Sequence, residues 1–220
     1  MAEPLTIYGN GQMAEFAYAR LRSDARYEIV GFTVDRSHLR EPQVCGLPIV
    51  PFDEVERHFP PQSVRMFIAV GPVQGNRIRA DRFTQARGLG YRFVSYVSSR
   101  AIVDPDITVG ENCSIGECAI VQAFTRIGDD VRIGSASVIG HHCVLEDHCV
   151  IGVGSVLAGS VRIGARAFIG VNATIRDRIT IGEGCIIGAG ATIVRDTAPG
   201  SVHAAPESVV LPLSSDRVRL

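Results

Sequence analysis

The sequence predicts a chain in two parts: a small α/β unit with a Rossmann-like parallel sheet, followed by a parallel β-helix. Two observations predict this fold class. Strands alternate with helices over the first hundred residues, and a six-residue repeat runs through most of the second hundred. The expected boundaries are residues 1–97 for the sheet domain, 98–200 for the β-helix and 201–220 for a tail that caps it.

Length and charge limit the classes of partner. A chain of 220 residues is long enough for one large or two small domains, each with its own core. The formal net charge of −1 gives no electrostatic basis for binding nucleic acid or an anionic membrane surface. The start MAEPLTIYGNGQ lacks a signal-peptide pattern, and no window approaches the ~20 apolar residues of a membrane-spanning helix. We therefore expect a cytoplasmic protein whose partners are small molecules or proteins.

The first part alternates apolar strands with helices in the manner of a parallel sheet. LTIY (5–8) is the first expected strand, and a helical stretch follows a glycine-containing turn and continues to about residue 21. The further expected elements are the strands EIVGFTVD (28–35), VRMFIAV (64–70) and YRFVSYV (91–97) and the helix RIRADRFTQARGLG (77–90).

The turn GNGQMA (9–14) has the GxGxxA spacing of a phosphate-binding turn at a helix N-terminus. Asp35 ends the second strand 24 residues after Gly11, a combination that is also typical of dinucleotide dehydrogenases. A unit of about 97 residues is too short for the six-stranded dinucleotide fold, so we disfavour that function. A turn with a purely structural role is the other alternative.

The repeat is visible when the chain is divided into blocks of six from Ala101. The third position is Val, Ile or Leu in 16 consecutive blocks, from Val103 to Ile193, and Gly follows it in ten of them. This period is typical of a β-helix, in which three blocks form one coil of about 18 residues and residues 18 apart are vertical neighbours. The aliphatic residue is expected to point inward, and the glycine to relieve the turn between faces.

Four cysteines occupy the small first position of their blocks and are expected to be core residues without a redox or metal role: Cys113, Cys143, Cys149 and Cys185. Cys113, Cys149 and Cys185 share a face, but each lies two coils from the next, which is too far for a disulfide.

A small Rossmann-like unit joined to this repeat resembles the hexapeptide-repeat sugar acyltransferases of the NeuD and PglD-like type, which fold as left-handed parallel β-helices. The resemblance covers nearly the whole chain. It is carried by YGNGQMAE (8–15), FTVD (32–35), AVGPVQGNRIR (69–79), YVSSRAIV (96–103), GHHCVLEDHCVIG (140–152) and GAGATIVRDTAPGSV (188–202). It implies a cytoplasmic homotrimer, with active sites between subunits and no metal. Its implied activity is transfer of an acetyl group from acetyl-CoA to a hydroxyl or amine of a nucleotide-linked sugar in surface polysaccharide biosynthesis.

The resemblance also assigns binding residues in both parts of the chain. In the sheet domain the implied nucleotide-sugar pocket is lined by Gly11, Gln12, Met13, Asp35, Arg36 and Gly71. Along the β-helix, backbone groups of Gly159, Val171 and Ala189 are implied to contact CoA.

The stretch SVIGHHCVLEDH (137–148) holds three of the six histidines. His141 and His142 are the fifth and sixth residues of their block, at a turn between faces, and Gly159 lies one coil above His141 and leaves space beside its imidazole. The resemblance makes His141 the general base. In that mechanism His141 takes the acceptor's proton, an amide near Gly159 stabilises the oxyanion, and CoA leaves as the thiol without an acyl-enzyme.

The other polar residues at the turns are expected to be solvent-exposed, and for His142 and His148 exposure competes with a role in the site. These turn residues are Asp129, Asp130, Arg166 and Asn172.

His142 stands where related amino-sugar enzymes often have a glutamate beside the catalytic histidine. A second histidine does not supply that acid, so we expect a group other than His142 to orient His141. Both His141 and His142 are nevertheless assigned as catalytic residues. His-His pairs also occur in O-acyltransferase relatives, which favours a hydroxyl acceptor.

Two other functions are compatible with parts of the pattern. One is a trimeric scaffold that binds a sugar nucleotide without turnover. The other is a metal enzyme like the gamma-type carbonic anhydrases, which hold zinc with three histidines from two subunits. The spacing of His141 and His142 from His148 does not fit that zinc motif, and the remaining histidines, at 38, 58 and 203, lie outside the suitable coils.

Overall fold

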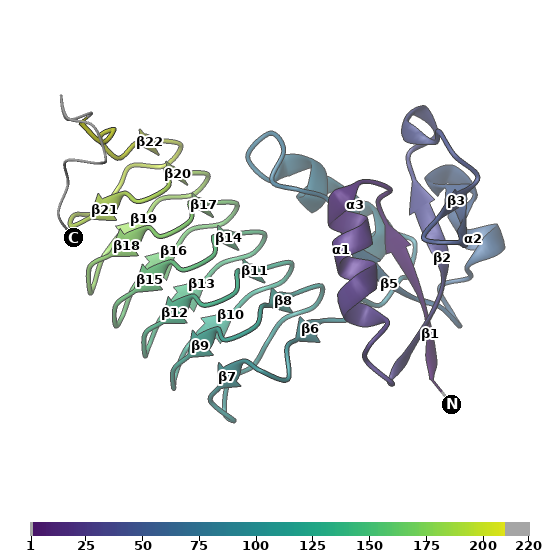
Figure 1. The fold of residues 1–220 in the computed structure, drawn as a ribbon, viewed down its shortest axis with the longest axis horizontal. Helices are drawn as coiled ribbons and strands as arrows, with labels where there is room; N and C mark the ends of the chain where they lie inside the picture. The colour runs from purple at the N-terminus through teal and green to yellow at the C-terminus, as the bar shows by residue number, and fades with distance from the viewer. Residues whose placement is uncertain (1, 210–220) are drawn as a thin grey trace, which may run out of the picture.

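The computed structural model describes residues 2–209, which form a sheet domain from β1 to α3 and a prism from β6 to β22 (Figure 1). The five-stranded sheet has the order β3-β4-β2-β1-β5, with β1, β2, β4 and β5 parallel. Its strands are β1 (Glu3–Tyr8), β2 (Tyr27–Val34), β3 (Gln43–Val44), β4 (Leu47–Pro51) and β5 (Arg65–Ile68). The helices are α1 (Gln12–Leu21), α2 (Val55–His58) and α3 (Arg77–Gly88), with short 3-10 helices at Arg36–His38 and Phe52–Glu54.

Alternation along β1 divides the core of this domain between the two faces of the sheet. Leu5 and Ile7 point to one face and pack in one cluster with Leu21 of α1. Tyr8 points to the other face and packs with Phe83 of α3. Helices therefore cover both faces, and the expected Rossmann-like unit is confirmed.

Two parts of this domain differ from the sequence expectation. The hairpin of β3 and β4 is antiparallel and was not expected. The segment YRFVSYV does not form one strand of the sheet: Phe93 makes a single bridge to Met66, and β6 (Tyr96–Val97) pairs with β8 of the prism. The chain leaves the sheet domain inside this segment, so its last residues join the other part of the molecule.

The prism consists of three parallel sheets. Face 1 contains β6, β8 (Ser114–Ile115), β11 (Arg132–Ile133), β14 (Val150–Ile151), β17 (Phe168–Ile169), β20 (Ile186–Ile187) and β22 (Val202–His203). Face 2 contains β7 (Ile102–Val103), β9 (Ile120–Val121), β12 (Val138–Ile139), β15 (Val156–Leu157), β18 (Thr174–Ile175) and β21 (Thr192–Ile193). Face 3 contains β10 (Arg126–Ile127), β13 (Val144–Leu145), β16 (Arg162–Ile163) and β19 (Thr180–Ile181).

The vertical register is the expected 18 residues, as in the pairing of Val138 with Val156. The aliphatic third positions from Ile115 to Ile193 are all buried in one continuous core. The left-handed parallel β-helix predicted from the repeat is thus confirmed.

The role expected for the repeat glycines was wrong. Left-handed backbone falls on the sixth position of every block from Asn112 to Gly190, as at Phe124 (φ 64°) and His142 (φ 58°), and not on the glycine at the fourth position. The glycines are needed because the next coil passes close to them: a Cβ on Gly116 would lie 2.6 Å from the backbone nitrogen of Ser135.

The core placement of the four cysteines is confirmed, because all are fully buried: Cys113, Cys143, Cys149 and Cys185. The thiols of Cys113, Cys143 and Cys185 lie within hydrogen-bond distance of backbone carbonyls, as between Sγ of Cys113 and the oxygen of Gly128 at 3.1 Å. Burial raises the pKa of the Cys113 thiol to about 12, so it stays protonated at neutral pH.

Asp130 is not at a solvent-exposed corner, which corrects the sequence expectation, and His148, for which exposure was one of two alternatives, is mostly covered as well. Arg79 of α3 and Asp130 are both fully buried, and their Nη1 and Oδ1 atoms are 2.7 Å apart. The second carboxylate oxygen of Asp130 lies 2.8 Å from Nδ1 of His148. Asn112 donates to Asp130 and accepts from the backbone N–H of Ile68 at the end of β5. The corner is buried because the sheet domain docks on it.

The end of the described chain still follows the prism. β22 pairs with β20, so Val202 and His203 add a rung inside the segment expected to form a capping tail. Residues 210–220 of that tail lie outside the described residues. Within residues 2–209, no helix is long and apolar enough to cross a membrane.

Replacing Arg79 by methionine should destabilise the folded protein by about 3–5 kcal/mol, since it leaves the carboxylate of Asp130 buried without its cation. The measurement is urea unfolding followed by circular dichroism. Arg77→Met, at an exposed position of the same helix, is the control and should change stability by less than about 0.5 kcal/mol. Equal midpoints for the two variants would contradict this account of the junction.

Candidate functional site

A cavity of about 440 Å³ opens at the carboxyl ends of β1, β2 and β5. Its lining includes five of the six residues predicted for the sugar-nucleotide pocket: Gly11, Gln12, Met13, Asp35 and Gly71. Ligands of open parallel sheets bind at this edge, so the position agrees with the prediction. The structure adds Tyr8, Asn10, His38 and Ile78 to the lining.

The turn between β1 and α1 shapes one wall of the cavity. Gly9 has φ 129°, and a Cβ on it would lie 2.9 Å from the carbonyl oxygen of Ala69. Only glycine allows the two strand ends to approach so closely. Gly11 is the N-cap of α1 and lines the cavity with Gln12 and Met13, and no side chain caps the first N–H groups of the helix there.

Asp35 is held in the cavity wall by two neighbours. The hydroxyl of Tyr8 donates to Oδ1 at 2.8 Å, and Nη2 of Arg82 donates to Oδ2 at 2.7 Å. Burial, followed by the hydrogen bond to Asp35, raises the pKa of Tyr8, so its hydroxyl remains a donor at neutral pH. The carboxylate is thereby fixed, with lone pairs left for hydroxyl groups of a ligand.

Arg36 lies outside this cavity. Its guanidinium is exposed and bonds Asp53 at 2.9 Å and Glu54. The side chain borders a neighbouring depression with Asp53 and Arg82. The structure therefore leaves Arg36 outside the cavity that the other five predicted residues line, although Asp35 borders both hollows.

The imidazole of His141 lies against Gly159, as the 18-residue register predicted. A Cβ on Gly159 would be 2.6 Å from Cε1 and 2.7 Å from Nε2 of that ring. The backbone N–H of His141 donates to the side chain of Gln122 at 3.1 Å. The ring is exposed and rests on a glycine that leaves it room.

The group that contacts the other side of the His141 ring is His142. The two Nδ1 atoms are 3.0 Å apart, and the rings meet edge to face. His142 in turn stacks on Phe124, with ring centroids 4.7 Å apart. The expectation named a group other than His142 as the one that orients His141, whereas the structure places His142 itself within hydrogen-bond distance, and a neutral histidine can accept a hydrogen bond as well as carry charge.

The predicted residues of the prism do not all meet in one chain. His141 and Gly159 lie at the corner between faces 2 and 3, whereas Val171 and Ala189 lie exposed at the corner between faces 1 and 2. The sheet domain contacts face 1 and its two flanking corners, through pairs such as Arg20 with Glu117 and Arg79 with Asp130. The corner of His141 is the third one, so one chain does not bring His141 to the cavity.

No group of three or more His, Cys, Asp or Glu side chains suited to a metal ion occurs among residues 2–209.

Several residues of the candidate site were missed from the sequence. Tyr8 and Arg82 hold Asp35, and Gln122 and Phe124 support the histidine pair. Phe124 could have been found, because it lies one coil below His142 in the established register. Arg82 gives no such signal, since only the docking of α3 on the sheet brings it to β2.

Comparison with known proteins identifies the repeat. Residues 124–159 and 160–195 match the family model described as bacterial transferase hexapeptide (six repeats). A comparison with curated protein sequences gave no match.

Several solved structures match nearly the whole chain. The acetyltransferase domain of PglB from Neisseria gonorrhoeae has a TM-score of 0.84 at 29% identity, over 92% of this chain and 97% of that chain. Perosamine N-acetyltransferase from Caulobacter crescentus has a TM-score of 0.83 at 30% identity, over 93% of this chain and 95% of that chain. WeeI from Acinetobacter baumannii shares the fold, with a TM-score of 0.80 at 18% identity over 91% and 96%.

A hexapeptide prism with a histidine at its corner, joined to a sheet domain with a cavity, defines a left-handed β-helix transferase. The chain belongs to the sugar acyltransferases of this class, and it is a sugar acetyltransferase.

Replacing Gly159 by alanine should displace the His141 ring, because the new methyl group would overlap it. We expect sugar acetylation to fall by about 10²-fold or more with the fold retained, since a shift of about 1 Å in a catalytic group has that effect. The rate is measured by thiol release. Gly88→Ala, whose added Cβ meets nothing within 4 Å, is the control. Full activity of Gly159→Ala would contradict the placement of the base.

Proposed function

We propose that this protein transfers an acetyl group from acetyl-CoA to a hydroxyl or amine of a nucleotide-linked sugar, as a homotrimer with His141 as the general base. We place the reaction in surface polysaccharide biosynthesis, in the cytoplasm. The observation that carries the proposal is the His141 ring, exposed at a prism corner beside Gly159 and bonded to His142.

The substrates are proposed from the relatives. The Caulobacter crescentus enzyme, 30% identical, was solved in complex with CoA and GDP-perosamine, also as mutants in which one histidine is replaced by asparagine or alanine. The Neisseria gonorrhoeae domain, 27% identical in that comparison, was solved in complex with acetyl coenzyme A. The perosamine enzyme is an N-acetyltransferase, which favours an amine acceptor over the hydroxyl suggested by the His-His pair.

The histidine pair supplies both a base and its orientation. For Nε2 of His141 to accept a proton, Nδ1 must carry the other one. The Nδ1–H of His141 then donates to the Nδ1 lone pair of His142, which carries its own proton on Nε2. His142 thus fixes the tautomer of His141 and remains neutral itself. In related enzymes a carboxylate beside the histidine fixes the tautomer.

The chemical step is a direct transfer. Nε2 of His141 removes the acceptor's proton as the acceptor oxygen or nitrogen forms a bond to the thioester carbon. The carbonyl oxygen becomes an oxyanion, and the backbone N–H of Gly159, which makes no hydrogen bond within the described residues, is positioned beside the ring to donate to it. The carbon–sulfur bond then breaks, and the proton on His141 passes to the CoA sulfur.

The sheet-domain cavity supplies the acceptor site. The free N–H groups at the start of α1 suit the phosphates of a nucleotide, and the fixed carboxylate of Asp35 suits sugar hydroxyl groups. Because the cavity and His141 lie on different sides of one chain, the base that serves this cavity comes from a neighbouring subunit. Three-fold symmetry closes such an arrangement.

Replacing His141 by alanine should lower kcat/KM for thiol release by about 10²–10⁴-fold, the usual contribution of a general base. The assay uses acetyl-CoA with a panel of nucleotide sugars, and mass spectrometry of the product identifies the acetylated atom. His58→Ala, a half-exposed histidine of α2, is the control and should keep full activity. Unchanged activity of His141→Ala would rule out this base, and absence of turnover by wild-type protein would favour the scaffold.

Variants of His142 test whether His142 fixes the tautomer of His141. His142→Phe should lower kcat by at least about tenfold, since loss of tautomer control costs up to about 10⁴-fold in the serine protease triad. Phe124 occupies the same left-handed position one coil below, so the backbone tolerates the change. His142→Asn retains an accepting oxygen and should recover most of kcat. Equal kcat values for the Phe and Asn variants would show that His142 only packs.

A further inference from the structure

Arg132 differs from the other arginines at its position in the repeat. It is the first residue of β11, equivalent to Arg126 in β10 and Arg162 in β16, whose side chains are exposed. Arg132 is 8% exposed because α1 of the sheet domain covers it. Among the described residues its guanidinium makes one hydrogen bond, from Nη2 to the carbonyl oxygen of Ile68 at 2.8 Å, and its buried Nε has no partner.

The charge of Arg132 is also without a partner. Three other arginines of the sheet domain reach the prism at this junction, and each has a carboxylate there: Arg79 pairs with Asp130, Arg20 with Glu117, and Arg87 with Glu111 and Asp129. Burial, and then repulsion by Arg79, lowers the pKa of Arg132 to about 9, which leaves it protonated at neutral pH. Arg132 is therefore a buried cation without a carboxylate within salt-bridge distance in the described part of the chain, and an unpaired buried charge is costly.

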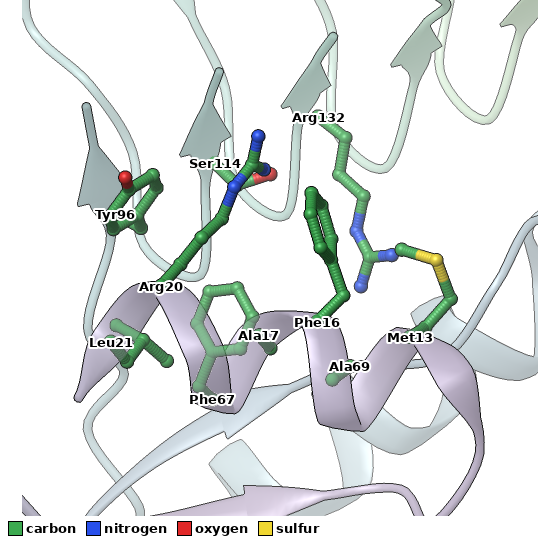
Figure 2. A pocket seen from close by; sticks show the side chains of 10 residues that line it. All are labelled: Met13, Phe16, Ala17, Arg20, Leu21, Phe67, Ala69, Tyr96, Ser114 and Arg132. Carbon is green, nitrogen blue, oxygen red and sulfur yellow. The ribbon is translucent and has the colours of Figure 1, made fainter. Parts of the chain in front are cut away.

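A cavity lies beside this cation, between α1 and face 1 of the prism (Figure 2). Its volume of about 30 Å³ accommodates roughly two waters or one small anion. Arg132 reaches down from its strand beside Phe16 and Met13, while Arg20 extends from α1 toward Ser114 (Figure 2). Nε of Arg20 is buried and unpartnered like Nε of Arg132. The lining thus combines two positively charged guanidinium groups, which can donate hydrogen bonds, with apolar walls. It contains no carboxylate.

We propose that this cavity is a binding site for a small inorganic anion of halide size, held by Arg132 with Arg20 and stabilising the junction between α1 and the prism. The anion supplies the counter-charge that Arg132 lacks and accepts from its unpartnered Nε, while Arg20 adds a second positive charge to the lining. Met13 and Ala69 line both this cavity and the sugar-nucleotide cavity, so the anion occupies a separate place behind the substrate wall. The small volume favours a monatomic anion over the larger phosphate and sulfate groups.

Bromide tests the site, because its anomalous scattering locates it in a crystal. We expect a bromide peak within about 3.5 Å of a guanidinium nitrogen of Arg132 in wild-type crystals soaked in sodium bromide. In solution, raising bromide at constant ionic strength against gluconate should raise the wild-type Tm by about 3 °C with saturation. Arg132→Met should lose this rise, and Arg126→Met, the exposed equivalent, should keep it.

Each result decides the proposal. A peak at Arg132 together with a Tm rise lost only in Arg132→Met supports it. The absence of a bromide peak at Arg132 in well-ordered wild-type crystals overturns the proposal. An equal Tm response of the wild type, Arg132→Met and Arg126→Met also overturns it, because a peak in the crystal would then mean binding at crystal concentration only. If Arg132→Met does not fold, two wild-type measurements decide: the bromide peak in the crystal, and the Tm in bromide compared with the Tm in sulfate at the same ionic strength. An equal rise of the wild-type Tm in sulfate contradicts a site of halide size.

Discussion

The 18-residue vertical register is the constraint on which the rest of the structure depends. The strands of each coil donate backbone N–H groups to carbonyls of the next coil, as from Val138 to Ser155 and from Gly140 to Leu157, and the turns donate to the preceding coil, as from His142 to Ala123. The next coil passes close to the glycines that follow the inward aliphatic residue in ten of the blocks, and the sixth residue of each block from Asn112 to Gly190 adopts the left-handed conformation. The same register sets His141 against Gly159 and His142 above Phe124. The candidate catalytic geometry is therefore a property of the stacking.

Much of this could be predicted from the sequence, since a period of six determines its own contacts. The buried cysteines and the contact between His141 and Gly159 follow from counting alone. The burial of Asp130 and His148 does not, because it arises from Arg79, which belongs to a different part of the chain. Likewise, the bond between His141 and His142 depends on ring orientations at a left-handed turn, which no spacing rule specifies.

The junction between the two parts determines what one chain can and cannot do. Asn112 and Arg132 of the prism hold the backbone N–H and carbonyl of Ile68, so the end of β5 is fixed on face 1. The residues that follow β5 line the sugar-nucleotide cavity. The cavity is thereby held on one side of the prism while His141 stays at the opposite corner. A rigid junction of this kind makes a second subunit part of the proposed active site.

Hybrid trimers give the most direct test of this central claim. One subunit type carries His141→Ala with an intact cavity, and the other carries Asp35→Ala with an intact base. Each variant alone should be inactive, whereas random mixing at equal amounts should restore about a quarter of the wild-type rate, the share of sites between neighbours that combine both intact halves. Native mass spectrometry confirms that hybrids have formed. Hybrid trimers without activity would contradict the account, because they would show that each chain uses its own His141.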